Sequence, residues 1–240
     1  MALHLENVVP WGRSASEYSA MFALTPEGLN GRILDCAAGP SSFTAEMTEQ
    51  GKSVMACDPL YQFSTEEIQQ RIDESYPRML ALNEAHKDKF LWHLYGSPAQ
   101  LGEIRMRVMR HFLQDYPQGK QDGRYVVGEL PTLPFPSGHF DLALCSHFLF
   151  TYSDQFSAEF HVNSLVEMAR VAREVRVFPL LTAFSNKISP PLPVAMEALQ
   201  RRGYAVEVRQ VDYEFLKGGN KMLRVAANER PQTVLTGQIP

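Results

Sequence analysis

The stretch Gly31-Arg-Ile-Leu-Asp-Cys-Ala-Ala-Gly-Pro-Ser-Ser-Phe43, followed by Val54-Met-Ala-Cys-Asp58, decides the fold. It predicts a buried strand, a loop of small residues, a short helix and a second strand that ends in a carboxylate. Within the loop, Ala37, Ala38 and Gly39 leave room for a ligand to approach the backbone. An open α/β sheet holds an adenosine-containing cofactor at the carboxyl ends of its strands in this order of elements.

The residues that flank these elements support the same arrangement. Ser41 or Ser42 is placed to cap the helix, and Gly51 to end it in a left-handed conformation. Asp58 follows the second strand directly, so its carboxylate can accept two hydrogen bonds from a ribose diol. Pro59 and Leu60 come next and complete this part of the predicted cofactor-binding set.

The loop after the first strand separates two kinds of cofactor site. A dinucleotide site requires Gly-x-Gly-x-x-Gly, whereas the pattern here is Asp35-x-Ala37-x-Gly39-x-Ser41. A leading acid followed by small residues at alternate positions resembles motif I of the class I S-adenosylmethionine-dependent methyltransferases. The resemblance implies that this loop passes under the methionine half of the cofactor and that Asp35 helps to hold its ammonium group. Ala37 and Ser41 stand where that family usually has glycine.

A later segment, Gly128 to His147, is similar to the second signature of the same family. On that resemblance Glu129 accepts a hydrogen bond from the adenine amino group, and Leu130 packs on the ring. Ser146 and His147 lie at the tip of the fourth strand, beside the sulfonium.

The resemblance implies a three-layer α/β sandwich around a mostly parallel seven-stranded sheet, with an antiparallel last strand and a helical insert after strand two. We expect one domain over residues 1–228 and a flexible tail over residues 229–240. Among the later elements, we expect a fifth strand over Glu174–Phe184 and a helix over Pro193–Arg202. Tyr204–Phe215 and Met222–Ala227 are expected to form a closing hairpin.

The insert has room for three helices. A capping box at Ser64–Glu67 opens the first, and Tyr76-Pro77 is expected to break it. The second is expected to run from Arg78 to about Tyr95; Ser97 caps the third, and the linker back to the sheet begins at Pro117. Residues 62–116 are a candidate lid over the substrate. Four basic side chains of this lid are candidates to bind an acidic substrate or an RNA backbone: Arg105, Arg107, Arg110 and His111. Alternatively, they form a solvent-exposed face of the helix.

The segment before the first strand is a second candidate cover for the cofactor. Ser16 is expected to cap a helix that carries Tyr18 and Phe22 on one face. In the enzymes that the chain resembles, this helix closes over the methionine carboxylate, with which Arg13 could pair and Tyr18 could form a hydrogen bond. Alternatively, Tyr18 and Phe22 dock the helix on the sheet, and Arg13 is a surface cation.

Methyl transfer depends mainly on placing a nucleophile in line with the methyl carbon. His147 is the candidate base, because its pKa normally lies near neutral pH, and Tyr152 is a candidate to orient the substrate. A lone histidine at a strand end is more often structural. The other histidines have no metal-ligand spacing, so we predict no metal.

Composition narrows the class of protein. The 240 residues carry a net charge of −4, which argues against nucleic acid as a partner. No apolar run could span a membrane and the N-terminus lacks a signal pattern, so we predict a cytoplasmic protein. The three cysteines, Cys36, Cys57 and Cys145, suit neither disulfides nor zinc.

The predicted function is methylation of a small molecule by S-adenosylmethionine. The Asn/Asp-Pro-Pro-aromatic tetrapeptide of many base and glutamine methyltransferases is absent, with Ser146-His147-Phe148-Leu149 in its place. The alternatives are a cofactor-binding module, or an RNA or protein methyltransferase that works with a partner. An NAD(P)-dependent oxidoreductase is disfavoured, because the loop lacks the pyrophosphate glycines. The pattern does not predict an oligomeric state.

Overall fold

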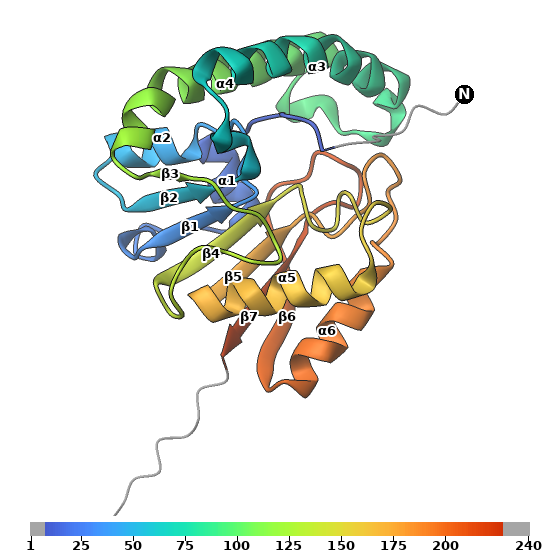
Figure 1. Cartoon of the computed structure of the whole chain (residues 1–240). Helices are drawn as coiled ribbons and strands as arrows, with labels where there is room; N and C mark the ends of the chain where they lie inside the picture. The colour runs from blue at the N-terminus through green and yellow to red at the C-terminus, as the bar shows by residue number, and fades with distance from the viewer. Residues whose placement is uncertain (1–7, 228–240) are drawn as a thin grey trace, which may run out of the picture.

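Seven strands form one sheet in the order β3-β2-β1-β4-β5-β7-β6, in a computed structural model that describes residues 8–227 (Figure 1). Strand β7 runs antiparallel to the other six strands, which are parallel to one another. The strand bounds are Ile33–Cys36 for β1, Val54–Cys57 for β2, Tyr125–Val126 for β3, Phe140–Ser146 for β4, Ala172–Phe178 for β5, Tyr204–Gln210 for β6 and Lys221–Ala227 for β7. The predicted fold class is confirmed.

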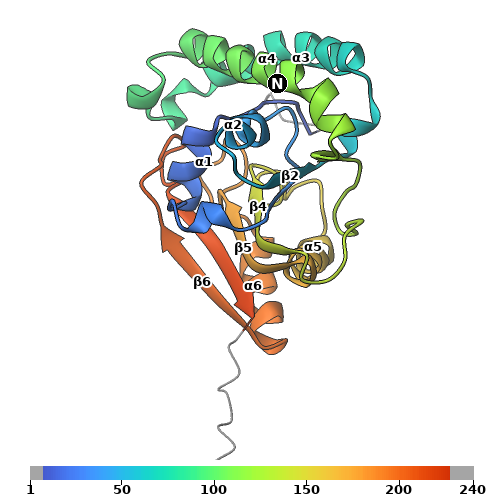
Figure 2. The same cartoon turned by 90° about the vertical axis from the view of Figure 1, so that its left-hand side faces the viewer.

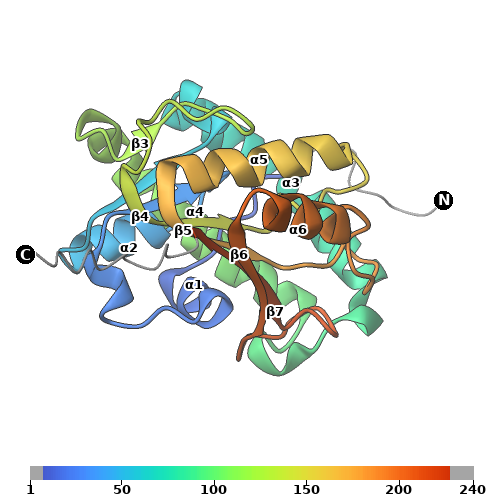
Figure 3. The same cartoon turned by 90° about the horizontal axis from the view of Figure 1, so that it is seen from below.

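Helices cover both faces of the sheet (Figure 3). On one face lie α1 (Ala15–Phe22) and α2 (Phe43–Glu49), and on the other α5 (Ala158–Val171) and α6 (Pro191–Arg201). The largest apolar cluster joins the central strands to α5 and α6. Figures 1 and 2 show α3 (Thr65–Ala85) and α4 (Pro98–Gln121) side by side across one end of the sheet.

The insert between β2 and β3 therefore holds two long helices, and the prediction of three was wrong. Helix α3 continues through Pro77, and α4 continues through Pro117, where the linker was expected to begin. Proline removes one helical hydrogen bond and frees a carbonyl. The carbonyl freed by Pro77 belongs to Asp73, which is exposed and accessible to water, whereas that freed by Pro117 belongs to Leu113, which is buried. The predicted caps at Ser64 and Ser97 are confirmed.

Other boundaries differ from the sequence predictions. The cap of α1 is Ser14 rather than Ser16, because Ser14 and Glu17 form a reciprocal capping box. Ser42 is the N-cap residue of α2, but its side chain makes no capping hydrogen bond. Strand β5 ends at Phe178 instead of Phe184, and β6 ends at Gln210 instead of Phe215. The predicted tail, residues 229–240, lies outside the described residues.

The three cysteines lie next to one another across the sheet. Cys36 on β1 is in register with Cys57 on β2 and with Cys145 on β4. All three are buried and free. Burial raises the pKa of Cys57 and of Cys145 to about 12. These thiols therefore stay protonated in the folded protein and belong to the core.

No helix within residues 8–227 combines the length and the apolar character needed to cross a lipid bilayer.

Candidate functional site

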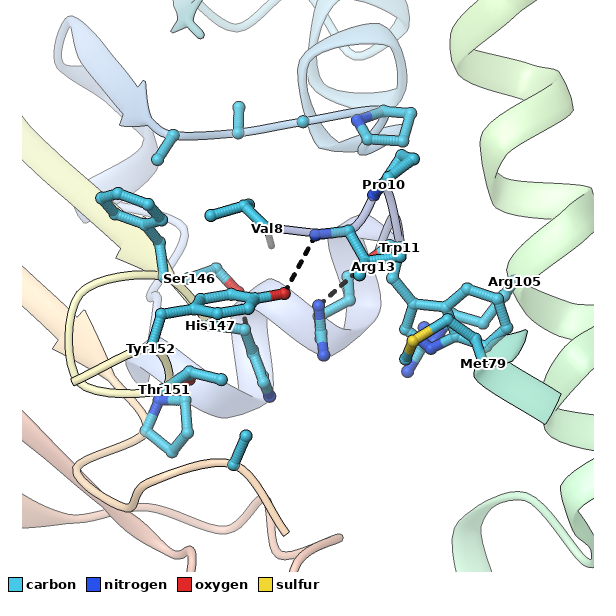
Figure 4. A pocket seen from close by; sticks show the side chains of 18 of the residues that line it. Val8, Pro10, Trp11, Arg13, Met79, Arg105, Ser146, His147, Thr151 and Tyr152 are labelled. Carbon is cyan, nitrogen blue, oxygen red and sulfur yellow. Dashed lines mark hydrogen bonds between the residues drawn. The ribbon is translucent and has the colours of Figure 1, made fainter. Parts of the chain in front are cut away.

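A cavity of about 330 Å³ lies at the carboxyl ends of the strands, beneath the insert (Figure 4). Its volume is within the range of small-molecule sites. The structure brings most of the predicted site residues together on its walls. These are Arg13, Tyr18, Ala37, Gly39, Asp58, Pro59, Leu60, Ser146, His147 and Tyr152. The remaining three, Asp35, Glu129 and Leu130, do not line it.

Asp35 lies behind the wall of the cavity and contacts it through Tyr18. The Tyr18 hydroxyl donates a hydrogen bond of 3.2 Å to Oδ1 of Asp35. The other carboxylate oxygen, Oδ2, is buried and has no hydrogen-bond partner among the described residues. Burial raises the pKa of Asp35 well above its usual value.

Asp58 ties the tip of β2 to the small-residue loop. Its Oδ2 accepts from the Gly39 amide at 2.9 Å, and its Oδ1 accepts from the Leu60 amide at 2.7 Å. A carboxylate has about four acceptor positions, so two remain for a ligand. Burial raises the pKa of Asp58 to about 6. The hydrogen bonds from the Leu60 and Gly39 amides lower the pKa, but by less than burial raises it.

Glu129 and Leu130 lie between β3 and β4 and are not among the residues that line the cavity. The Glu129 side chain is exposed, while Leu130 is buried in the apolar cluster that includes Cys57. Their proposed contact with adenine stays a prediction.

A pair of buried charges, which the sequence did not reveal, forms one side of the site. Arg105 on α4 donates two hydrogen bonds of 2.7 Å to the two carboxylate oxygens of Glu17 on α1. Only 1% of the Arg105 side chain and 9% of the Glu17 side chain are exposed. The Tyr95 hydroxyl donates to the same carboxylate. Although burial alone would raise it, the pKa of Glu17 is lowered to about 2 by Arg105.

Among the described residues, no carboxylate forms an ion pair with Arg13. Its guanidinium donates to the Trp11 carbonyl at 3.0 Å, and its buried Nε has no partner among residues 8–227. Burial and the neighbouring Arg105 both lower the pKa of Arg13. A partly buried cation with no ion pair among residues 8–227 gains from an anionic partner, so this side of the cavity favours an anionic ligand group.

His147 lies at the tip of β4 near Arg13 (Figure 4). Burial, followed by the charges of Arg13 and Arg105, lowers its pKa well below the ordinary value. The ring is therefore neutral at pH 7, with Nδ1 3.0 Å from the Ser146 hydroxyl. The Tyr152 hydroxyl accepts a hydrogen bond of 3.2 Å from the Val9 amide.

Backbone strain gathers around the cavity. Ala37, His147 and Phe184 have φ angles of 52°, 51° and 54°, in the left-handed region that non-glycine residues rarely adopt. All three line the cavity. Such strain is concentrated at functional sites. No feature of the sequence near Phe184 predicted its position.

The remaining basic residues of the proposed lid do not reach the cavity. Arg107 and Arg110 are exposed, and His111 lies 2.9 Å from Glu49. Of the four candidates for an acidic substrate, Arg105 alone lines the cavity, and Glu17 already neutralises it. Within the described part of the chain, no cluster of His, Cys, Asp or Glu is placed to hold a metal ion.

Gly12 sets how closely the N-terminal segment approaches the small-residue loop. A Cβ at Gly12 would lie 2.1 Å from the Pro40 carbonyl oxygen, so both segments would have to move. We expect Gly12→Ala to lower the free energy of unfolding by at least about 1 kcal/mol, measured by urea denaturation. Gly28→Ala is the control, since its Cβ meets its nearest atom at 3.5 Å. Equal stability of the two variants would contradict the close approach.

No protein-family profile matches the sequence. Among solved structures, the chain is similar to magnesium protoporphyrin IX methyltransferase from Synechocystis PCC 6803, at 12% identity over 82% of this chain and 70% of that chain, with a TM-score of 0.42. It is also similar to a TehB-like SAM-dependent methyltransferase from Corynebacterium glutamicum, at 16% identity over 90% and 86% of the two chains, with a TM-score of 0.46. These similarities concern the arrangement of elements and say nothing of what this chain binds.

One relative is similar along almost its whole length. The sequence is 31% identical over 222 residues to the uncharacterized protein MJ0045 of Methanocaldococcus jannaschii, which covers 92% of this chain and 97% of the relative. The chain therefore belongs to the same protein family as MJ0045.

Proposed function

We propose that the protein is an S-adenosylmethionine-dependent methyltransferase that acts on a small molecule. The observation that carries this proposal is the meeting of two separate motifs in one cavity. The Asp58 carboxylate, at the tip of β2, is held by the amide of Gly39 in the small-residue loop after β1. This contact supports Asp58 as the acceptor of the ribose hydroxyls, beside a loop that a ligand can approach closely.

The walls of the cavity suggest how the cofactor would be held. Asp58 would accept from the two ribose hydroxyls, and Arg13 would pair with the methionine carboxylate. Tyr18 and the buried Asp35 behind it would face the ammonium group. Pro59 and Leu60 after β2 would complete the cofactor wall, together with small residues at the tips of β1 and β4: Ala37, Gly39 and Ser146. Glu129 and Leu130 remain the adenine contacts suggested by the motif.

The bound cofactor supplies an electrophilic methyl group on a sulfonium. The chain's own contribution is to align the acceptor and to take up the proton that it loses. His147 is placed for that uptake, because it lies at the tip of β4 and lines the cavity. Its ring is neutral at pH 7 and can accept a proton, although the burial and the charges of Arg13 and Arg105 that lower its pKa also weaken it as a base. Tyr152 would orient the acceptor from the adjoining loop. The cytoplasmic location stays a prediction.

Two measurements test this function. Calorimetric titration of the protein with S-adenosylhomocysteine should show binding, whereas NADH should not bind; the reverse would favour an oxidoreductase. Incubation with labelled methyl donor and cell extract should then place the label in a small molecule. Label in protein or RNA would favour a macromolecular acceptor, and no label would favour a cofactor-binding module.

The affinity for S-adenosylhomocysteine should depend on pH through Asp58. The pKa of Asp58 is about 6 in the folded protein and 3.8 for a free carboxyl group. The folded state therefore binds the proton more tightly than the unfolded state, and protonation of Asp58 stabilises the fold as the pH falls through this range. The ribose contact instead requires the ionised carboxylate. We expect affinity to fall about tenfold between pH 7 and pH 5.

The control for this pH dependence is Asp58→Asn, whose side chain does not titrate. Its affinity for S-adenosylhomocysteine should be lower and nearly constant between pH 7 and pH 5. The same pH dependence in the variant and the original protein would assign the effect to another group.

A further inference from the structure

The cavity extends beyond the proposed cofactor wall. In the sheet, β4 separates β1 and β2, which carry that wall, from β5 and β7. His147, at the tip of β4, therefore stands between two halves of the cavity. The second half is walled by five aromatic residues, which we name the aromatic subsite: Phe90, Phe178, Phe184, Tyr213 and Phe215.

The rings of the aromatic subsite contact one another. Phe90 stacks on Phe215 with ring centroids 4.6 Å apart and meets Phe184 edge-on at 5.9 Å. Phe178 meets Tyr213 edge-on at 5.6 Å and lies 5.5 Å from the His147 ring. These rings form two groups, which Tyr95 joins: its ring meets Phe215 edge-on at 4.7 Å, and its hydroxyl lies 2.8 Å from the hydroxyl of Tyr213.

Backbone hydrogen bonds fix the segments that carry these rings. The Leu91 amide donates to the Phe215 carbonyl at 2.7 Å, beside an antiparallel bridge between Phe90 and Leu216. The Asn186 side chain donates to the Lys217 carbonyl at 2.8 Å. The insert, the loop after β5 and the segment before β7 are thus joined around the subsite, which favours a rigid, preformed pocket.

Among the described residues, no charged side chain of this half lines the cavity. Lys89 and Lys217 belong to its segments but do not line it, and their ammonium groups donate to the backbone carbonyls of Phe184 and Asp88. Among the described lining residues, the Lys, Arg, Asp and Glu side chains are Arg13, Asp58 and Arg105, which come from outside the subsite. Glu17 pairs with Arg105, and the proposed function assigns Arg13 and Asp58 to the cofactor.

We propose that the aromatic subsite binds the methyl acceptor, and that the acceptor is an uncharged, planar aromatic molecule whose reacting atom faces His147. The inference rests on the proposed function and adds the class of substrate. Aromatic faces and edges favour a flat π-system, and a site without counter-charges disfavours an ionised one.

Calorimetry on the full chain, saturated with S-adenosylhomocysteine at pH 7.5, tests this proposal. The probes are 2-naphthol, which is uncharged, and 2-naphthoate, its carboxylate analogue. We expect 2-naphthol to bind at least about tenfold more tightly than 2-naphthoate. Tighter binding of 2-naphthoate, or no binding of 2-naphthol to protein that does bind S-adenosylhomocysteine, would overturn the subsite and leave the proposed function intact. Failure of S-adenosylhomocysteine itself to bind would overturn both.

A pair of variants places the probe in the cavity. Phe184→Ala should weaken 2-naphthol binding about tenfold and leave the affinity for S-adenosylhomocysteine unchanged. Ile188→Ala is the matched control, because this side chain lies on the same loop, is 63% exposed and does not line the cavity. Equal 2-naphthol affinities in the two variants, or displacement of 2-naphthol by S-adenosylhomocysteine, would contradict a separate acceptor subsite.

Discussion

Replacing Arg105 with leucine is expected to lower the free energy of unfolding by about 3–5 kcal/mol, because it leaves the Glu17 carboxylate buried without its partner. The two side chains share two hydrogen bonds of 2.7 Å and are almost fully excluded from water. Urea denaturation at pH 7 measures the loss. The pair joins α1 to α4, so the variant should also loosen the cavity wall.

Two further variants test whether the unpaired charge causes this loss. Arg110→Leu changes an exposed arginine of the same helix and should alter stability by less than about 0.5 kcal/mol. Adding Glu17→Leu to Arg105→Leu removes the unpaired carboxylate and should restore part of the stability. Similar losses for Arg105→Leu and Arg110→Leu would show that the buried pair contributes little.

Asp58→Ala is expected to weaken S-adenosylhomocysteine binding by about 1–3 kcal/mol, a factor of roughly 5 to 150. The variant removes the proposed acceptor of both ribose hydroxyls and also the acceptor of the Gly39 and Leu60 amides. Calorimetry measures the affinity, and circular dichroism checks that the variant folds. Asp73→Ala, at an exposed position of α3, is the control. Unchanged affinity in a folded Asp58→Ala variant would mean that the ribose lies elsewhere.

The strand tips were predictable because their position follows from local pattern and sheet geometry. Once the stretches around Asp35 and Val54 form adjacent parallel strands, Ala37, Gly39 and Asp58 must lie at one edge of the sheet. The length of α3 was not predictable in the same way. Whether Pro77 breaks a helix depends on access of water to the freed carbonyl, and tertiary structure decides that.

The residues that close the cavity were harder to predict, because they come from distant segments. Glu17 and Arg105 are 88 positions apart, and no local pattern connects them. One signal was present: Arg105 falls at helical spacing between Leu101, Val108 and Phe112, which are buried. A cation within an apolar stripe predicts a buried partner. The aromatic subsite offered no such signal, since three separate segments supply its rings.

The buried thiols on β1, β2 and β4 make it possible to measure opening of the sheet through their reactivity. Maleimide reacts with thiolate, and these sulfurs are both covered and protonated in the native fold. The sequence contains three cysteines, and each is buried at or next to the carboxyl end of its strand, so alkylation requires these strand ends to open. Their labelling rate therefore measures opening of the sheet and, in the absence of ligand, can compare Arg105→Leu with the original protein without denaturant.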